Sequence, residues 1–208
     1  MDNKETTTKE QILLAAETEF MLNGYDGAKM LNIAKRAGVN HALLHYYYST
    51  KQNLFHEVLN RKTELLAKSF IDAFKGNREL PLIERIESGF FAHFDFLRAN
   101  PLLPQFIISQ VIANADNLSY FSSFVRHHGK NIVDMLQKEI DLNVEKGHFK
   151  HVRAIDLLYD ALSLNILPFL TRPLLTECEG ILFEEPYEQF LINRKKELST
   201  VIRSRLLK

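Results

Sequence analysis

The sequence predicts an all-α protein. Apolar residues recur at helical spacing over long stretches of the chain, which is the main sign of amphipathic helices. The 208 residues include only 8 glycines and 6 prolines, too few for a β-rich or linker-rich chain. With 46% hydrophobic and 25% charged residues, the composition is that of an ordinary globular protein. We therefore expect helices packed around a sizeable core.

The first predicted helix begins near Thr8, after a polar arm (residues 1–8) that we expect to be disordered. Its buried face consists of five residues at positions i, i+3, i+4, i+7 and i+8: Ile12, Ala15, Ala16, Glu19 and Phe20. All of them except Glu19 are apolar. Asn23-Gly24 is predicted to end this helix, because glycine readily adopts the left-handed conformation found at helix C-caps.

Two short helices are predicted next. The first covers residues 28–37 and is broken by Gly38. The second covers only residues 40–47, and Asn40 is a favourable N-cap for it. Two short helices joined by a three-residue turn that starts with glycine are typical of a helix-turn-helix motif.

A long fourth helix is predicted over residues 51–75, with Thr50 as its N-cap. The remaining helices are predicted over five segments: 82–99, 101–115, 117–146, 152–171 and 186–207. We expect two domains, an N-terminal one over residues 6–66 and a larger helical one over residues 67–208.

The predicted third helix has an unusual outer face. Leu44 and Tyr48 are placed to face inward, so His41, Ala42, His45 and Tyr46 project outward. These short or flat groups suit base edges in a major groove better than bulk water. The alternative is a structural helical hairpin with chance tyrosines.

Charge supports contact with nucleic acid at this place only. The whole chain has 26 basic and 26 acidic residues, whereas the window 27–56 contains four basic residues and no acidic one: Lys29, Lys35, Arg36 and Lys51. A local positive field is what phosphate contact needs. Tyr47 and Lys51 are placed to reach phosphates, and the start of the fourth helix, at Thr50 and Lys51, favours an anion.

The N-terminal region resembles the TetR family of transcriptional regulators. The matching residues are Ile12, Ala15, Ala16, Phe20, Gly24, Tyr25, Met30, Ile33, Ala34, Ala37, Gly38, Val39, Leu44, Tyr47, Tyr48, Lys51 and Leu54. The resemblance implies a three-helix DNA-binding head, a connecting fourth helix, and an all-α C-terminal domain for dimerisation and often ligand binding. Four positions depart from the family's pattern, so an operator sequence cannot be borrowed from a relative: Ala28, Leu43, His45 and Tyr48.

Two sets of site residues are predicted. The DNA-binding set is Lys29, Asn40, His41, Ala42, Leu43, His45, Tyr46, Tyr47, Thr50 and Lys51. A ligand pocket in the C-terminal domain is predicted from aromatic residues at helical spacing with polar neighbours: Phe90, His93, Phe94, Phe106, Gln110, Phe121 and Phe124. The alternative for most of the second set is ordinary core.

The last two predicted helices favour a dimer. Helix 152–171 is apolar nearly all round, which indicates burial on more than one side, and helix 186–207 carries an apolar stripe. The resemblance implies that these helices form the homodimer interface, and packing within one chain is the alternative.

The expected function is that of a cytoplasmic repressor. A homodimer would bind a palindromic double-stranded DNA operator and be released by a small apolar effector. Two alternatives are a DNA-binding dimer regulated by a protein partner and a helical interaction protein without DNA binding.

Other classes are disfavoured by the sequence. No glycine-rich phosphate loop and no nucleophile motif is present, so we expect no enzyme and no cofactor. His41 and His45 lack the nearby further ligands that a metal site needs. The single cysteine, Cys178, fits a reducing compartment. No apolar run approaches the ~20 residues of a membrane span, so no membrane partner is expected.

Overall fold

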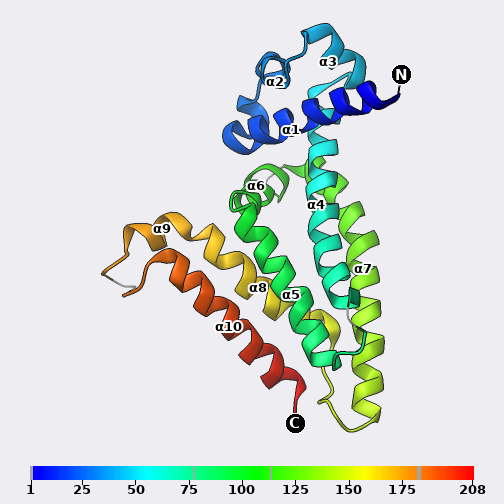
Figure 1. Ribbon diagram of the computed structural model, residues 1–208, viewed down its shortest axis with the longest axis vertical. Helices are drawn as coiled ribbons and strands as arrows, with labels where there is room; N and C mark the ends of the chain where they lie inside the picture. The colour runs from blue at the N-terminus through cyan, green and yellow to red at the C-terminus, as the bar shows by residue number, and fades with distance from the viewer. Residues whose placement is uncertain (1, 77, 113, 182–183) are drawn as a thin grey trace. The chain divides into compact units, whose positions relative to one another are not determined.

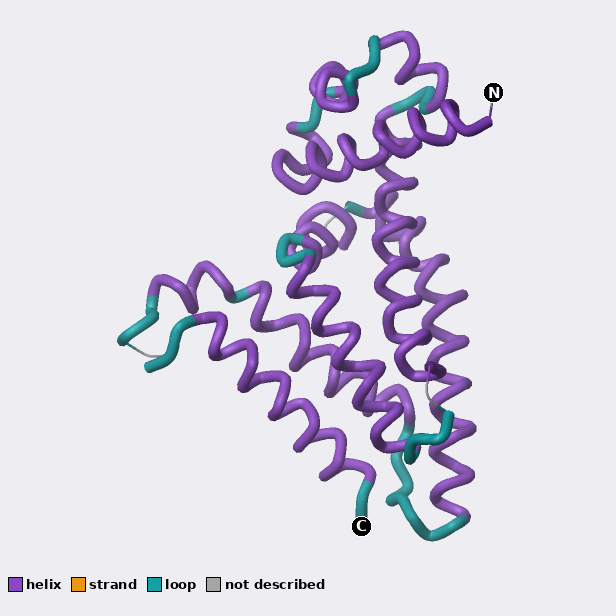
Figure 2. The backbone as a smooth tube through the Cα atoms, in the orientation of Figure 1, coloured by secondary structure: helices purple, strands orange, loops and turns teal. Residues whose placement is uncertain are grey.

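The computed structural model describes residues 2–76, 78–112, 114–181 and 184–208, with side chains from residue 8 onward except those of residues 124, 127 and 128. Figure 2 shows helices joined by loops throughout these ranges. The single antiparallel bridge between Phe149 and Leu207 is the one extended pairing recorded within them. The predicted all-α fold class is confirmed.

The chain forms two compact units. The head unit consists of Met1–Glu64 together with Phe106–Ser123, and the body unit consists of Leu65–Gln105 together with Phe124–Lys208. A second stretch of chain therefore joins the N-terminal residues in the head unit. The predicted domain limits, 6–66 and 67–208, stay a prediction.

The head unit begins with helix α1 (Asp2–Gly27), which contains a non-helical residue, Gly24. Helices α2 (Met30–Ala37) and α3 (His41–Tyr47) follow, and α3 leads into α4 (Lys51–Gly76). Helix α2 packs against α1, and α3 packs against α2 (Figure 1). Helix α1 starts earlier than the predicted Thr8, while the bounds of α3 and α4 lie within about one residue of the prediction.

The segment 101–115 differs from the single α-helix that was predicted. It forms the short helix α6 (Leu103–Phe106), followed by a π-helical turn, η1 (Ile107–Ile112). The next helix, α7, covers Ala115–Glu145. Segments of π-helix carry one extra residue per turn and are uncommon, so apolar spacing alone did not reveal η1.

Aromatic rings hold the core of the head unit together. Phe20 on α1 and Phe55 on α4 are fully buried and meet edge to face, with ring centroids 5.2 Å apart. Phe106, at the end of α6, lies 5.5 Å from Phe55 between ring centroids. The second chain stretch of the head unit is thus part of its core.

The body unit is built around α5 (Leu82–Ala99), α8 (Ala154–Leu170) and α10 (Tyr187–Leu206), which lie side by side in Figure 1. The short helix α9 (Arg172–Glu177) was not predicted, and it begins with a proline in its first turn. The core is apolar and includes Phe70, Phe74, Ile86, Phe90, Leu136, Ile140, Leu157, Leu198 and Ile202.

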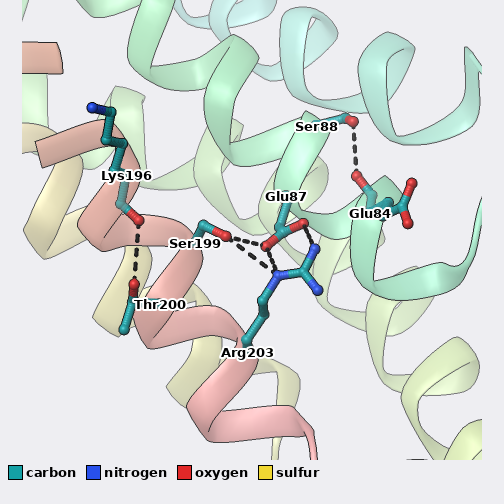
Figure 3. A network of polar contacts seen from close by, with 7 residues as sticks. All are labelled: Glu84, Glu87, Ser88, Lys196, Ser199, Thr200 and Arg203. Carbon is teal, nitrogen blue, oxygen red and sulfur yellow. Dashed lines mark hydrogen bonds and ion pairs between the residues drawn. The ribbon is translucent and has the colours of Figure 1, made fainter. Parts of the chain in front are cut away.

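An ion pair with one buried partner, Glu87, joins α5 to α10 (Figure 3). The carboxylate of Glu87, which is buried, accepts two hydrogen bonds from the guanidinium of Arg203, at 2.7 and 2.6 Å. The hydroxyl of Ser199 donates a further hydrogen bond to Glu87. The hydrogen bonds to Glu87 and the negative charge of Glu87 raise the pKa of Arg203 above its usual value. A carboxylate in an apolar setting needs such compensation, so the pairing of α5 with α10 is fixed in register.

Within the described ranges, every helix is too short or too polar to cross a lipid bilayer.

Candidate nucleic-acid interface

The turn between α2 and α3 depends on one glycine. Gly38 has φ 69° and ψ 25°, the left-handed conformation. Its N–H donates to the carbonyl of Lys35, and the N–H of Val39 donates to that of Ala34. This is the Schellman pattern, which satisfies the last carbonyls of a helix and reverses the chain. The turn that was predicted from the sequence is present.

Asn40 fixes the start of α3. Its side-chain oxygen accepts a hydrogen bond from the N–H of Leu43 at 2.7 Å, as an N-cap should. Asn40 was also in the predicted DNA-binding set, but this cap engages its side-chain oxygen. Leu44 is fully buried and anchors the helix. The side of α3 opposite Leu44 is therefore held toward solvent.

The exposed face of α3 consists of the residues that the sequence analysis placed there. His41, Ala42, His45 and Tyr46 are all exposed, and the exposed fraction of Tyr46 is 74%. The rings of His41 and His45 meet edge to face, with centroids 4.4 Å apart. Leu43 and Tyr47 are half-buried at the sides of this face.

His45 presents a defined hydrogen-bonding edge. Its Nδ1 lies 3.2 Å from the carbonyl oxygen of Ser49. Because a carbonyl only accepts, Nδ1 must carry the proton in this contact. In the neutral ring Nε2 is then an acceptor. Such an atom can accept a hydrogen bond from the amino group of adenine or cytosine in a major groove.

Glu19 caps α2 from another helix, which the sequence analysis did not foresee. Lys29, the N-cap residue of α2, has no side-chain cap of its own. Instead Oε1 of Glu19, which is only 2% exposed, accepts from the N–H of Lys29 at 3.4 Å and from Nδ2 of Asn32 at 3.0 Å. Glu19 also lies 3.7 Å from the guanidinium of Arg36. The positive charge counted for the window 27–56 is thus partly offset by Glu19.

Lys51 lies at the start of α4 with its ammonium group already held. Thr50 Oγ1 accepts from the N–H of Asn53 at 3.1 Å, which confirms the predicted cap. Nζ of Lys51 donates to the carbonyl of Asp26 at 3.2 Å and lies 4.7 Å from the centre of the Tyr25 ring. An ammonium group has three hydrogens, so this position leaves donors for an anion.

Tyr47 also lines a polar cleft of about 360 Å³. Its lining is Lys9, Tyr47, Tyr48, Ser49, Asn53, His56, Glu57 and Tyr120. Lys9, an exposed cation, was missed because no sequence pattern places it near α3. The Tyr48 hydroxyl is buried and has no hydrogen-bond partner among the described residues. Burial, followed by the charges of Glu57 and Glu10, raises the pKa of Tyr48 to about 12.

Comparison with known proteins matches the head unit to one family. Residues 12–58 match the model of bacterial regulatory proteins, tetR family. The chain is also 33% identical over 87 residues to the HTH-type transcriptional activator FasR of Mycolicibacterium smegmatis. Over residues 12–58 the chain is therefore similar to the tetR family. The aligned stretch is 42% of this chain and only 39% of the FasR relative, so it spans less than half of that protein.

The fold of the whole chain is similar to that of solved transcriptional regulators. A TetR transcription regulator from Haloarcula marismortui has a TM-score of 0.70, with 21% identity, over 97% of this chain and 99% of the other. HlyIIR, a hemolysin II transcriptional regulator, has a TM-score of 0.60, with 20% identity, over 94% of this chain and 98% of the other. At this identity the likeness concerns the fold.

The predicted ligand-pocket residues fall into two groups. Phe90, His93 and Phe94 are buried on α5 in the body unit. Phe106, Gln110 and Phe121 belong to the stretch 106–123 of the head unit. The side chain of Phe124 lies outside the described part. A groove of about 540 Å³ between α5 and α10 includes Phe94 but otherwise has different lining residues: Phe91, Asp95, Arg98, Leu191, Ile192, Lys195, Lys196 and Ser199. The predicted pocket set stays a prediction.

His93 is part of a buried polar cluster. Nδ2 of Asn165 on α8 lies 3.0 Å from Nδ1 of His93 and donates to the carbonyl of Phe90 at 3.0 Å. Burial lowers the pKa of His93 to about 4, so the ring is neutral near pH 7. Over the described ranges, no three His, Cys, Asp or Glu side chains gather as metal ligands would.

Proposed function

We propose that the protein is a DNA-binding transcriptional regulator whose α3 reads base edges in the major groove. The observation that carries the proposal is the exposed face of His41, Ala42, His45 and Tyr46 on a helix capped by Asn40 and anchored by Leu44. The match of residues 12–58 to the tetR family model supports it. Base contacts of this kind confer specificity, whereas phosphate contacts position the protein.

Phosphate contacts are assigned to the flanks of α3. Lys29 is exposed before α2, and Lys51 lies at the first turn of α4. The free N–H groups at the start of a long helix add to the attraction for a phosphate. Tyr47 and Thr50, at the same edge, complete the proposed set.

The experiment that tests this proposal starts from selection of bound duplexes from a random DNA pool. Affinity for a selected duplex is then measured against salt concentration. His45→Ala and Tyr46→Ala are each expected to weaken binding to the selected duplex by about five- to a hundredfold, the range for one lost base contact, and to relax selectivity. Lys29→Ala is expected to weaken selected and random duplexes alike and to lower the salt slope by about one.

Lys138→Ala, an exposed cation on α7 in the body unit, is the matched control and should change neither quantity. The proposal is wrong if wild type shows no salt-dependent affinity for any duplex, as a helical interaction protein would. The reading face is wrongly assigned if both α3 variants discriminate between selected and random duplexes as wild type does.

We propose repression as the sign of regulation, because a dimer seated on an operator blocks access to it. Activation is the second candidate, since the FasR relative carries the name of an activator. A reporter gene placed downstream of the selected duplex distinguishes them. Reporter output falls on expression of the protein if it represses and rises if it activates.

We further propose that a small apolar ligand of the body unit lowers DNA affinity. The groove between α5 and α10 supports this, because its volume of about 540 Å³ lies within the usual range for ligand clefts, roughly 300–1,000 Å³. The coupling must equal the ligand's differential affinity for the two states. A screen for apolar compounds that raise the melting temperature and release DNA tests it. Release by a protein partner alone would favour the alternative regulator.

The last two long helices are the proposed homodimer interface. Their exposed apolar residues in the body unit support this: Ile155, Tyr159 and Leu167 on α8, and Ile192 on α10. A dimer of this kind would present its two α3 helices to half-sites about 34–36 Å apart.

A further inference from the structure

The π-helical turn η1 places one side chain against the last turn of α1. Gln110 lies in η1, and its Oε1 accepts a hydrogen bond from the N–H of Tyr25 at 2.7 Å. Both residues belong to the head unit, although 85 positions separate them. The contact therefore joins the stretch 106–123 to the end of α1.

Gly24 makes room for this contact. A Cβ atom at Gly24 would lie 3.1 Å from three atoms of the Gln110 amide, which is tighter than nine in ten real Cβ contacts. The backbone of Gly24 also has φ 66° and ψ 179°, a region used almost only by glycine. The amide of Gln110 thus packs on a bare Cα atom at the kink of α1.

The backbone of Gln110 is held by a second hydrogen bond. Nδ2 of Asn117, which is buried, donates to the carbonyl of Gln110 at 2.9 Å. Oδ1 of Asn117 lies 3.4 Å from Nε2 of His56 on α4. The His56 ring stacks on Tyr120 with centroids 3.9 Å apart and planes 7° apart. The segment that carries Gln110 is therefore anchored to α4 and cannot easily follow a movement of α1.

The turn that Gln110 holds is also the one that holds Lys51. Tyr25 packs edge to face on Phe55 at 5.0 Å and lies under the ammonium group of Lys51. The next residue, Asp26, provides the carbonyl that accepts from Lys51 Nζ. A loosening of the Tyr25 backbone would release both contacts of the Lys51 head.

We infer that Gln110 is a positioning residue for DNA binding: through Tyr25 and Asp26 it holds the Lys51 ammonium group at the start of α4, ready for a phosphate. The inference rests on the proposed function, since it assigns to Lys51 a phosphate contact. It adds a residue of η1, far from α3 in sequence, to the machinery that sets DNA affinity.

A double-mutant cycle tests the inference. Affinity for the selected duplex is measured against salt for wild type, Gln110→Ala, Lys51→Met and the double variant. Lys51→Met is expected to lower the salt slope by about 0.9, the loss of one phosphate contact. Gln110→Ala is expected to weaken binding about three- to tenfold when Lys51 is present and to have almost no further effect in the Lys51→Met background.

Hydrogen exchange and a second variant distinguish the proposed local effect from a general loss of folding. Gln110→Ala should speed exchange of the Tyr25 amide, while amides of α2 and α3 keep wild-type rates. Tyr25→Leu keeps the backbone N–H but removes the ring under Lys51, and it should also weaken binding only when Lys51 is present. Gln105→Ala, an exposed glutamine on α6, is the matched control and should bind as wild type does.

The outcomes separate this inference from the proposed function. If wild type binds no duplex, the proposed function fails. If wild type binds but Gln110→Ala weakens binding equally in both backgrounds, Gln110 has only a structural role and the inference is overturned. An unchanged salt slope in Lys51→Met also overturns the inference, because Lys51 would then make no phosphate contact for Gln110 to support.

Discussion

At Gly24 the kink in α1 uses a backbone conformation that other residues avoid. Its φ of 66° with ψ of 179° costs a non-glycine residue about 1–3 kcal/mol. The close Gln110 amide adds a steric restriction. The sequence pattern predicted a glycine stop at this position, but α1 continues for one more turn to Gly27.

Gly24→Ala is therefore expected to lower the free energy of unfolding by about 1–3 kcal/mol, measured by urea denaturation. Gly27→Ala is the matched control three residues on. There the nearest neighbour of a new Cβ is Asn23 Cβ at 3.4 Å, and no positive φ is involved. The control should be neutral or stabilising by up to about 1 kcal/mol. Equal losses in the two variants would contradict the assigned strain.

His93 makes the stability of the body unit depend on pH. Its pKa is lowered from 6.5 to about 4 in the folded protein, because burial disfavours the charged ring. Between those two values the unfolded chain binds a proton that the folded chain does not. By linkage, the free energy of unfolding then falls as the pH falls from about 6.5 toward 4.

His93→Gln is expected to reduce this loss, because glutamine keeps an acceptor for Asn165 without binding a proton in that range. Urea denaturation at a series of pH values from 7.5 to about 4 measures the effect. The difference in stability between variant and wild type should shift in favour of the variant as the pH falls. A constant difference across the series would show that His93 does not titrate as inferred.

At the scale of elements, the start of α2 shows a cap taken from a distant residue. The position before α2 has no capping side chain, and the carboxylate of Glu19 on α1 supplies the acceptor. An anion at a helix N-terminus is also favoured by the helix dipole. The packing of α2 on α1 and the start of α2 therefore depend on the same carboxylate.

Glu19→Ala is expected to destabilise the protein by about 1–2 kcal/mol, because it removes the acceptor that caps α2. Lys29→Ser places a local capping hydroxyl at the N-cap position, and it should restore stability in the Glu19→Ala background more than it alters wild type. Thermal unfolding of the four proteins measures the coupling. Strict additivity would mean that Glu19 is not the cap of α2.

The sequence predicted the elements whose signals are local. Gly38, Asn40 and Thr50 act on neighbours within four residues, and each was identified with its role. Glu19 was noted only as a polar member of an apolar face, because its partners on α2 are brought to it by tertiary structure. The turn η1 was missed since its apolar spacing resembles that of an α-helix, and α9 was hidden in a stretch read as a loop.

The candidate site divides in the same way. The exposed residues of α3 followed from the face opposite Leu44, so His41, Ala42, His45 and Tyr46 could be chosen from the sequence. Gln110 was predicted to line a ligand pocket only because it is a polar residue among aromatic residues in the sequence. Its contact with Tyr25 joins residues 85 positions apart, and no local pattern carries that information.

At the scale of the whole molecule, the proposed dimer depends on an apolar face that the body unit leaves exposed. Tyr159 is 72% exposed on α8, four residues after the exposed Ile155. A twofold interface uses the same patch on both subunits, so one substitution near the axis acts twice.

Tyr159→Asp is expected to shift the protein toward monomer, because two carboxylates would be buried without partners. Sedimentation measures the change, and affinity for a palindromic duplex should fall with it, since the half-sites are no longer bound together. Leu142→Asp, at an exposed leucine of α7, is the matched control and should leave the mass unchanged. If the Tyr159→Asp protein remains dimeric, the dimer interface lies elsewhere.

The capped helix α3 also has an evolutionary consequence. The contacts that shape it involve Gly38, Asn40 and Leu44, whereas the solvent-facing positions of the proposed reading face are His41, Ala42, His45 and Tyr46. Mutation of the solvent-facing positions can therefore retarget the protein to new promoters at little cost in stability. Gene duplicates of such a chain can drift toward separate regulons while their scaffolds stay alike.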